Sequence, residues 1–253
     1  MQYHNHQTHR PSSTKACVAL LFPALIVARS LNAADTEPSF PKWKGAAELG
    51  SIRTTGNTNT SSINATLNLK RKARVWDLVL NLDALTSKED DVTSKERYKG
   101  TLDLNRKFTR HHYLATTLSY EFDRFSGYDY QTLYSIGYGY RLINNRRHYL
   151  DAEIGPGYRY DQREDNSGAE EETVLRLAGK YFWKIQKGVE FDQMLSVNTG
   201  SQKTTWRSES SLKSRINGSL ATRISYHWDY TDTVPSDSKH TNSEFGVTLV
   251  YNF

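Results

Sequence analysis

The chain has 253 residues, of which 12% are aromatic and 37% hydrophobic, and its mean hydropathy is −0.71. This composition excludes a bundle of membrane helices, since each helix needs about 20 consecutive apolar residues, and 16 Tyr with 5 Trp are too many for a disordered chain. The formal charge of +5 could indicate a nucleic-acid partner, but Arg10, Lys15 and Arg29 lie in a leader without acids, and removing these three cations lowers it to +2. We therefore expect no nucleic-acid partner.

Residues 1–34 have the pattern of a secretory signal peptide. A polar, basic region precedes an apolar core over residues 16–28, and the small residues Ala33 and Ala34 follow. The core is too short to span a membrane, although a buried or amphipathic N-terminal helix is an alternative reading. The chain's single cysteine, Cys17, lies in this leader, so the exported protein would have no disulfide framework. Residues 35–42 then form a periplasmic lead-in.

From residue 43 onward, apolar and polar residues alternate with a period of two, which is typical of strands with two unlike faces. About twelve segments show this pattern, near residues 43–54, 63–70, 76–84, 97–108, 114–123, 131–142, 149–160, 174–184, 189–199, 205–216, 220–230 and 243–253. An even number of segments, each about ten residues long, is what a membrane barrel requires. The sequence thus predicts an all-β fold, a single antiparallel up-and-down transmembrane β-barrel over residues 43–253.

The predicted connections alternate in length. They are short after the even segments, and Asn217-Gly218 indicates a two-residue hairpin. They are long and polar after three of the odd segments, at residues 85–96, 161–173 and 231–242. This segregation favours a barrel whose termini and tight turns face the periplasm. Within the seventh segment, Gly155-Pro156-Gly157 predicts a bulge or kink, because proline removes a ladder donor.

The last segment places apolar and aromatic side chains on one face and ends in phenylalanine. We interpret this face as a C-terminal assembly signal, read by the barrel-assembly machinery; it comprises Phe245, Val247, Leu249, Tyr251 and Phe253. Other aromatic residues are expected to form two outward girdles in contact with outer-membrane lipids and lipopolysaccharide. Tyr113, Tyr149 and Trp183 are assigned to the periplasmic girdle, and Phe122, Tyr134 and Trp206 to the loop-end girdle.

Residues 43–58 (WKGAAELGSIRTTGNT), the turn Gly56-Asn57-Thr58-Asn59-Thr60, the Tyr-rich strands and the Asn-Phe terminus together resemble one known family. This is the family of salt-induced outer-membrane proteins, a domain of unknown function, and the resemblance covers residues 43–253. It implies a β-barrel in the outer membrane of a Gram-negative bacterium. It supplies no reaction and no catalytic residue that could be carried over.

The face opposite the apolar residues is rich in charge, and two readings of it are open. Charged rings could form a selectivity constriction, or salt bridges could simply pack the lumen, as in small barrels. We expect Asp151 and Glu153 to neighbour Arg141 and Lys184, and Glu190 and Asp192 to neighbour Lys184 and Arg215. The predicted network comprises Lys70, Asp77, Asp103, Arg141, Asp151, Glu153, Lys180, Lys184, Glu190, Asp192, Lys213, Arg215 and Arg223.

Candidate catalytic and metal motifs are weak. Ser225, His227 and Asp229 have the residue types of a hydrolase triad, but successive side chains on one strand face stand about 6–7 Å apart. The acidic stretch at residues 161–172 matches a calcium loop poorly, since Arg163 stands at a ligand position. We therefore expect no catalytic residue, no metal site and no cofactor.

Taken together, these patterns predict a monomeric, non-enzymatic protein of the outer membrane. It would act as a narrow channel or stabilise the envelope, and the resemblance adds a link to salt or osmotic stress. Two other functions stay open: a hydrolase acting on lipid or lipopolysaccharide, and a surface-binding protein acting through its extracellular loops.

Overall fold

The structure is a computed structural model that describes residues 43–54, 60–164, 168–235 and 238–253. The predicted signal peptide at residues 1–34 and the lead-in at residues 35–42 lie outside this part of the chain. Among the residues described, no helix is long and apolar enough to cross a membrane. Strands form nearly all of the regular structure instead.

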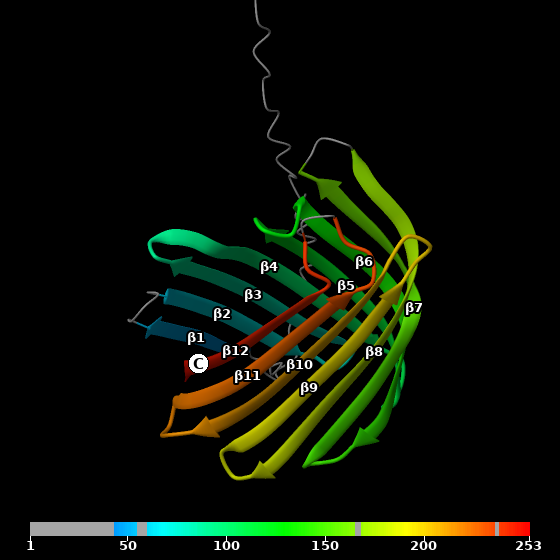
Figure 1. Cartoon of the computed structure of the whole chain (residues 1–253). Helices are drawn as coiled ribbons and strands as arrows, with labels where there is room; N and C mark the ends of the chain where they lie inside the picture. Colours follow the sequence, from blue (N-terminus) through cyan, green and yellow to red (C-terminus); the bar gives the residue numbers. More distant parts are fainter. Residues whose placement is uncertain (1–42, 55–59, 165–167, 236–237) are drawn as a thin grey trace, which may run out of the picture. The chain divides into compact units, whose positions relative to one another are not determined.

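Twelve β-strands in the described ranges close into one barrel, in which each strand pairs antiparallel with its neighbours in sequence and β12 returns to β1 (Figure 1). The strands are β1 (Trp43–Thr54), β2 (Thr60–Lys72), β3 (Trp76–Glu89), β4 (Val92–Lys107), β5 (His112–Asp123), β6 (Tyr128–Asn144), β7 (His148–Arg163), β8 (Ala169–Gln186), β9 (Val189–Thr199), β10 (Thr204–Arg215), β11 (Leu220–Thr231) and β12 (Thr241–Asn252). The predicted up-and-down barrel is confirmed.

The two faces of the wall differ as the period-two pattern requires. In β12, Phe245 and Leu249 are 63% and 51% exposed, whereas Thr248 and Val250 are 5% and 0% exposed. The register carries this distinction around the barrel, because directly opposed residues share a face, and exposed Leu49 lies opposite Leu249. The outward face is therefore apolar and the inward face polar, the arrangement of a barrel that is surrounded by lipid.

The aromatic girdles are confirmed for most positions and corrected for two. Trp183, Trp206 and Tyr134 are exposed on the outward face. Tyr113, however, is only 2% exposed and donates a hydrogen bond to the inward Glu153 carboxylate at 2.9 Å. Tyr149 also points inward, where its ring contacts Phe182. Both lie one residue out of phase with the outward set, so their position at a strand end was misleading.

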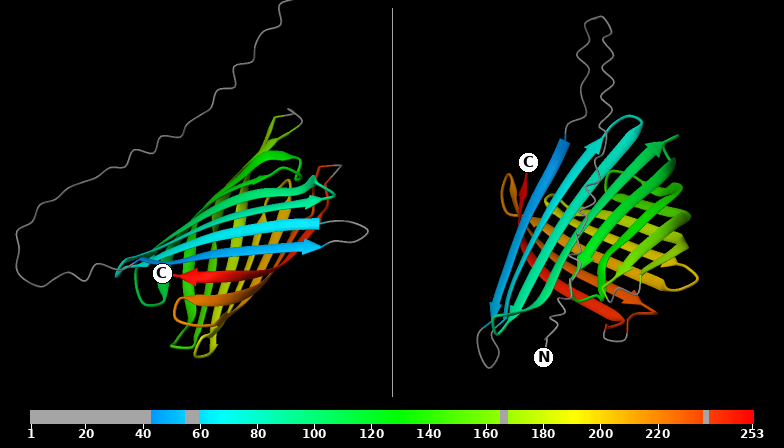
Figure 2. Two further views of the ribbon diagram at one scale, coloured as in Figure 1. Left: turned by 90° about the vertical axis from the view of Figure 1, so that its left-hand side faces the viewer. Right: turned by 90° about the horizontal axis from the view of Figure 1, so that it is seen from above.

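Short turns at one end of the barrel are confirmed, but one of the predicted long loops does not exist. β3 and β4 continue to a two-residue turn at Asp90 and Asp91, which have φ angles of 46° and 63°. The strands extend through the polar stretch that was predicted to be a loop. Both faces of this hairpin are polar, so the sequence shows no alternation in hydropathy that would indicate a strand. The β7–β8 hairpin likewise extends beyond its neighbours (Figure 2).

Two local expectations also change. The Asn217-Gly218 hairpin has a four-residue connection rather than a two-residue one, since β10 ends at Arg215 and β11 begins at Leu220. Around Pro156 the register between β6 and β7 does not shift, so the expected bulge is absent from this described segment. Gly155 instead packs against Gly137, where a Cβ atom would collide with the opposite backbone. Two facing glycines allow the strands to approach closely at this point.

Candidate functional site: the charged lumen

Every charged residue of the predicted lumen network lies on the inward face. The register places each of them in phase with buried or half-buried inward residues and out of phase with the exposed apolar set. The alternation of inward and outward positions along each strand, which we call strand parity, was therefore sufficient to assign these side chains to the lumen. Whether they serve a selective function is a separate question that parity leaves open.

The pairs expected between neighbouring strands are only partly present. Arg141 donates two hydrogen bonds to Asp151, with the closest atoms 3.0 Å apart. Glu153 pairs with Lys180 at 3.2 Å rather than with Arg141 or Lys184. Glu190 lies opposite Lys184 in the register but pairs with Lys213 at 2.8 Å.

Several ion pairs of the described residues join strands that are not neighbours in the wall, and we call four of them the cross-lumen pairs. Lys99 of β4 reaches Glu209 of β10 at 3.4 Å, and these two strands lie on opposite sides of the twelve-strand ring. The others are Arg207–Glu121 at 3.0 Å, Arg97–Glu244 at 2.6 Å and Lys180–Asp103 at 3.2 Å. They restrict the lumen because each side chain must extend across it. Parity could have placed Arg97, Lys99, Glu121, Arg207, Glu209 and Glu244 inward, but it cannot tell which strands face each other.

A buried charge cluster near the loop end was not anticipated. Lys203, in the turn between β9 and β10, is 4% exposed and lies 2.6 Å from the Asp161 carboxylate, which is itself 1% exposed. Its ammonium group also lies 3.3 Å from Glu170 and 4.3 Å from the centre of the Tyr128 ring. Burial lowers the pKa of Lys203, but the Asp161 carboxylate outweighs this effect and the net pKa is raised. The turn is thereby held against the inside of the wall.

Next to this cluster, Arg159 of β7 links the same turn to β7 and β8. Its guanidinium donates to the Glu172 carboxylate at 2.7 Å and to the Lys203 and Asn198 carbonyls, each at 3.2 Å. Of the acids that suggested a calcium loop, Asp161 pairs with Lys203 and Glu172 with Arg159, whereas residue 165 lies outside the described residues. Glu170 also pairs with Arg163, at 3.0 Å. Over the described ranges, no group of three or more His, Cys, Asp or Glu side chains is arranged to hold a metal.

The geometry does not assemble the Ser225, His227 and Asp229 motif into a triad. Asp229 accepts a hydrogen bond from Arg207 at 2.7 Å, so it does not orient the imidazole. The His227 ring lies 4.0 Å from Glu209, and the described contacts include no hydrogen bond between Ser225 and His227. A nucleophile and its base must be within hydrogen-bond reach, and these two residues are successive positions on one face.

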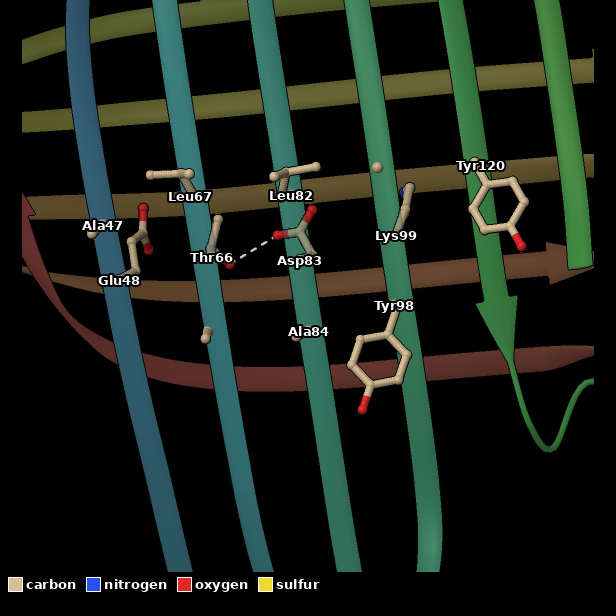
Figure 3. A pocket seen from close by; sticks show the side chains of 12 residues that line it. Ala47, Glu48, Thr66, Leu67, Leu82, Asp83, Ala84, Tyr98, Lys99 and Tyr120 are labelled. Atoms are coloured by element: carbon tan, nitrogen blue, oxygen red, sulfur yellow. Dashed lines mark hydrogen bonds between the residues drawn. The ribbon is translucent and has the colours of Figure 1, made fainter. Parts of the chain in front are cut away.

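The outer wall carries a groove of about 570 Å³ over β1–β5 (Figure 3). Small outward residues, Ala47, Ala65, Ala84 and Gly100, form its floor, and Leu67, Leu82, Tyr98 and Tyr120 border it. An apolar depression in a lipid-facing wall is chemically suited to hydrocarbon. It contributes to the membrane-facing surface, and the inward residues Glu48, Thr66, Asp83 and Lys99 also line it.

A closed antiparallel barrel with an apolar outer wall and a charged interior is an outer-membrane β-barrel. The chain belongs to the family described as "Protein of unknown function, DUF481", whose model matches residues 47–253. This confirms the family resemblance. A relative, "Uncharacterized protein YdiY" of Escherichia coli (strain K12), is 29% identical over 213 residues, which cover 83% of each chain.

Solved barrel structures are more distant. The porin NanC has 13% identity and a TM-score of 0.49, with 81% of this chain and 98% of that chain covered. The COG4313 outer membrane channel from Pseudomonas putida F1 has 11% identity and a TM-score of 0.46, with coverage of 87% and 100%. These scores lie below 0.5, so the fold assignment rests on the strand pairing described above.

Proposed function

We propose that the protein is a non-enzymatic, narrow channel of the outer membrane whose conductance is limited by the cross-lumen pairs. The observation that carries this proposal is the Lys99–Glu209 pair, which joins opposite sides of the ring at 3.4 Å. Charged side chains that meet across a lumen are the usual material of a selective constriction. Arg207–Glu121 contributes a second pair between the same two halves of the wall.

The proposal includes a response to salt, which follows the salt-stress link implied by the family resemblance. The Debye length falls from about 10 Å at 0.1 M salt to about 3 Å at 1 M, so ion pairs reached by water weaken as salt rises. The side chains of Glu209 and Arg207 are 33% and 26% exposed, which makes them accessible to such screening. Opening at high salt would let small solutes equilibrate across the membrane.

Planar-bilayer recording tests the channel. We expect small single-channel steps from the wild type, and larger steps or altered ion selectivity from a variant that carries Glu209→Gln and Glu121→Gln. Glu96→Gln is the matched control, because Glu96, in the first part of β4, pairs with the exposed Arg124 and not across the lumen. A silent membrane with both the wild type and the double variant would overturn the channel.

The same contacts support a second candidate, an envelope-stabilising barrel without transport. If the cross-lumen pairs hold permanently, they pack the interior as side chains do in small barrels. In that case the double variant would unfold more easily than the wild type, and neither protein would conduct.

We further propose the cellular context of this barrel. Export would depend on a signal peptide at residues 1–34, and the outward face of β12 would be read by the barrel-assembly machinery. The protein would function as a monomer in contact with lipid and lipopolysaccharide. The apolar, girdled outer wall supports the lipid contacts, and replacing residues 1–34 by a cytoplasmic start would test the export step by fractionation.

A further inference from the structure

The periplasmic end of the lumen holds more cations than the carboxylates beside them neutralise, since only Lys213 and Arg223 of the set have an ion-pair partner among the described residues. We call it the basic vestibule; it comprises Lys70, Lys72, Lys184, Lys213, Arg215 and Arg223. We propose that the basic vestibule binds a multivalent oxyanion of the phosphate type. This site lies outside the cross-lumen constriction, and its occupancy does not require that the barrel conducts.

Missing counter-charges are the first argument. Among the residues that the structure describes, the side chains of Lys70, Lys184 and Arg215 take part in no ion pair and no hydrogen bond, and all three residues are exposed within the lumen or at its mouth. Elsewhere in the lumen, cations such as Arg141 and Lys180 each contact a carboxylate within 3.2 Å. Three side chains without an ion-pair partner therefore gather at this end of the barrel.

The register supplies a second, independent argument. Lys70 lies directly opposite Lys44, and Lys213 lies directly opposite Arg223. Like charges in directly opposed positions destabilise a sheet. Two such juxtapositions on the inner wall are tolerable when an anion occupies the space between the cations.

These side chains also converge across the lumen, although they come from different strands. Lys70 of β2 interacts electrostatically with Asp192 of β9 and, more weakly, with Arg223 of β11 and Lys213 of β10. Glu190 of β9 interacts with Lys184 and Arg215 in addition to its partner Lys213. The four nearby acids, Glu48, Asp77, Glu190 and Asp192, are outnumbered by the six cations of the vestibule, and Asp77, opposite Lys72, pairs with Lys107 at 2.9 Å.

Arg223 is already oriented by Glu48 and by Ser211, to which its Nη1 atom donates at 3.5 Å, and it has a donor to spare. Its Nη2 atom lies 3.2 Å from Glu48, while its Nε atom is buried and has no hydrogen-bond partner in the described structure. A buried donor without a partner costs about 1–3 kcal/mol. Guanidinium groups match the tetrahedral oxygens of phosphate well, and ammonium groups contribute as point charges. A multivalent phosphate-type anion therefore fits this site better than a single carboxylate.

Calorimetry tests the proposal. The refolded full chain in detergent is titrated with sodium pyrophosphate at constant ionic strength. We expect saturable binding near one site per barrel, weakened at least tenfold when Lys70→Gln and Arg215→Gln are combined. Lys95→Gln is the matched control and should retain affinity within twofold, since Lys95 is an exposed cation near the opposite end of the lumen, 3.8 Å from Glu244.

Two outcomes would overturn the inference: no saturable heat from the wild type, or equal loss of affinity in the control and the double variant. The gel shift between unheated and boiled samples first establishes that each variant is folded. Glycerol phosphate and inorganic phosphate, titrated separately, distinguish an organic phosphate from the free anion. Because binding is measured without a membrane, the absence of conductance in a bilayer would contradict the proposed channel without contradicting anion binding by the basic vestibule.

Discussion

Individual charged residues in this barrel differ widely in how much they should stabilise it. Partly exposed pairs such as Lys213–Glu190 are weak on general grounds, at about 0–1 kcal/mol. Lys203 and Asp161 are different, since both side chains are almost completely excluded from water. Removing one member of a buried pair leaves the other charge without compensation. We therefore expect the Lys203 cluster to be the most sensitive part of the charged interior.

Replacing Lys203 by methionine should lower the free energy of unfolding by about 3–5 kcal/mol, because Asp161 would remain buried without its partner. Urea unfolding of the refolded barrel, followed by tryptophan fluorescence, measures this loss. Lys88→Met is the control, because Lys88 is exposed near the tip of the β3–β4 hairpin. Equal effects of the two substitutions would contradict the buried pair.

The same lysine makes a prediction about pH. Its pKa is raised in the folded state, because the Asp161 carboxylate outweighs the effect of burial. Because the pKa is raised, the ion pair stabilises the folded state fully at pH values below the pKa of lysine in the unfolded chain, about 10.4. This stabilisation is lost as the pH rises through the pKa of Lys203 in the folded state. The stability difference between wild type and Lys203→Met should therefore be constant from neutral pH to about pH 10 and shrink above it. A difference that shrinks between pH 6 and pH 9 would assign the effect to another group.

Residue parity explains both the success and the failure of the sequence in predicting the lumen. Period-two alternation determines the face of Arg141 and Asp151 and, with adjacent strands known, even their pairing. It contains no information on which strands oppose each other across a closed ring, so Lys99–Glu209 could not be predicted. Lys203 was missed for another reason, since it lies in a turn, where alternation does not apply.

At the scale of strands, the sequence predicted the elements correctly where hydropathy alternates and failed to predict them where both faces of the strand are polar. β1 and β9 match their predicted ranges, whereas β3 and β4 run on into the stretch predicted as a loop. The part of a strand that extends beyond the lipid needs no apolar face, so its amino-acid sequence resembles that of a loop. β7 is the opposite case, because Pro156 suggested a break and two facing glycines keep the strand continuous.

Replacing Gly155 by valine should destabilise the β6–β7 pair, because the new side chain would strike the backbone of Ile136 and Gly137. Overpacking of this kind costs about 1–3 kcal/mol. Gly179→Val is the matched control, since no atom lies within 4 Å of a Cβ built at Gly179. Urea midpoints of the two refolded variants compare them directly. A midpoint for Gly155→Val equal to that of the control would contradict the close approach of β6 and β7.

For the whole molecule, closure depends on the seam between the first and last strands. The register between β1 and β12 contains four residue pairs, against twelve between β1 and β2. Gly45 and Phe253 extend this short seam by two backbone hydrogen bonds of 2.8 and 2.9 Å. The Phe253 ring covers Gly45 on the outward face, where any Cβ atom would collide with it. The terminal phenylalanine that suggested an assembly signal is thus also part of the closure.

Replacing Phe253 by alanine should weaken the closed barrel by up to about 1 kcal/mol, the scale of a cross-strand side-chain contact. Phe245→Ala is the control, because Phe245 is as exposed on the same strand face but lies away from the seam. The temperature at which the folded gel band disappears should fall more for Phe253→Ala than for Phe245→Ala. If refolded Phe253→Ala is as stable as the control but fails to reach the outer membrane in cells, the residue acts through the assembly machinery alone. A loss of both stability in the refolded protein and delivery to the outer membrane in cells would mean that the seam contact and the assembly signal are the same physical feature.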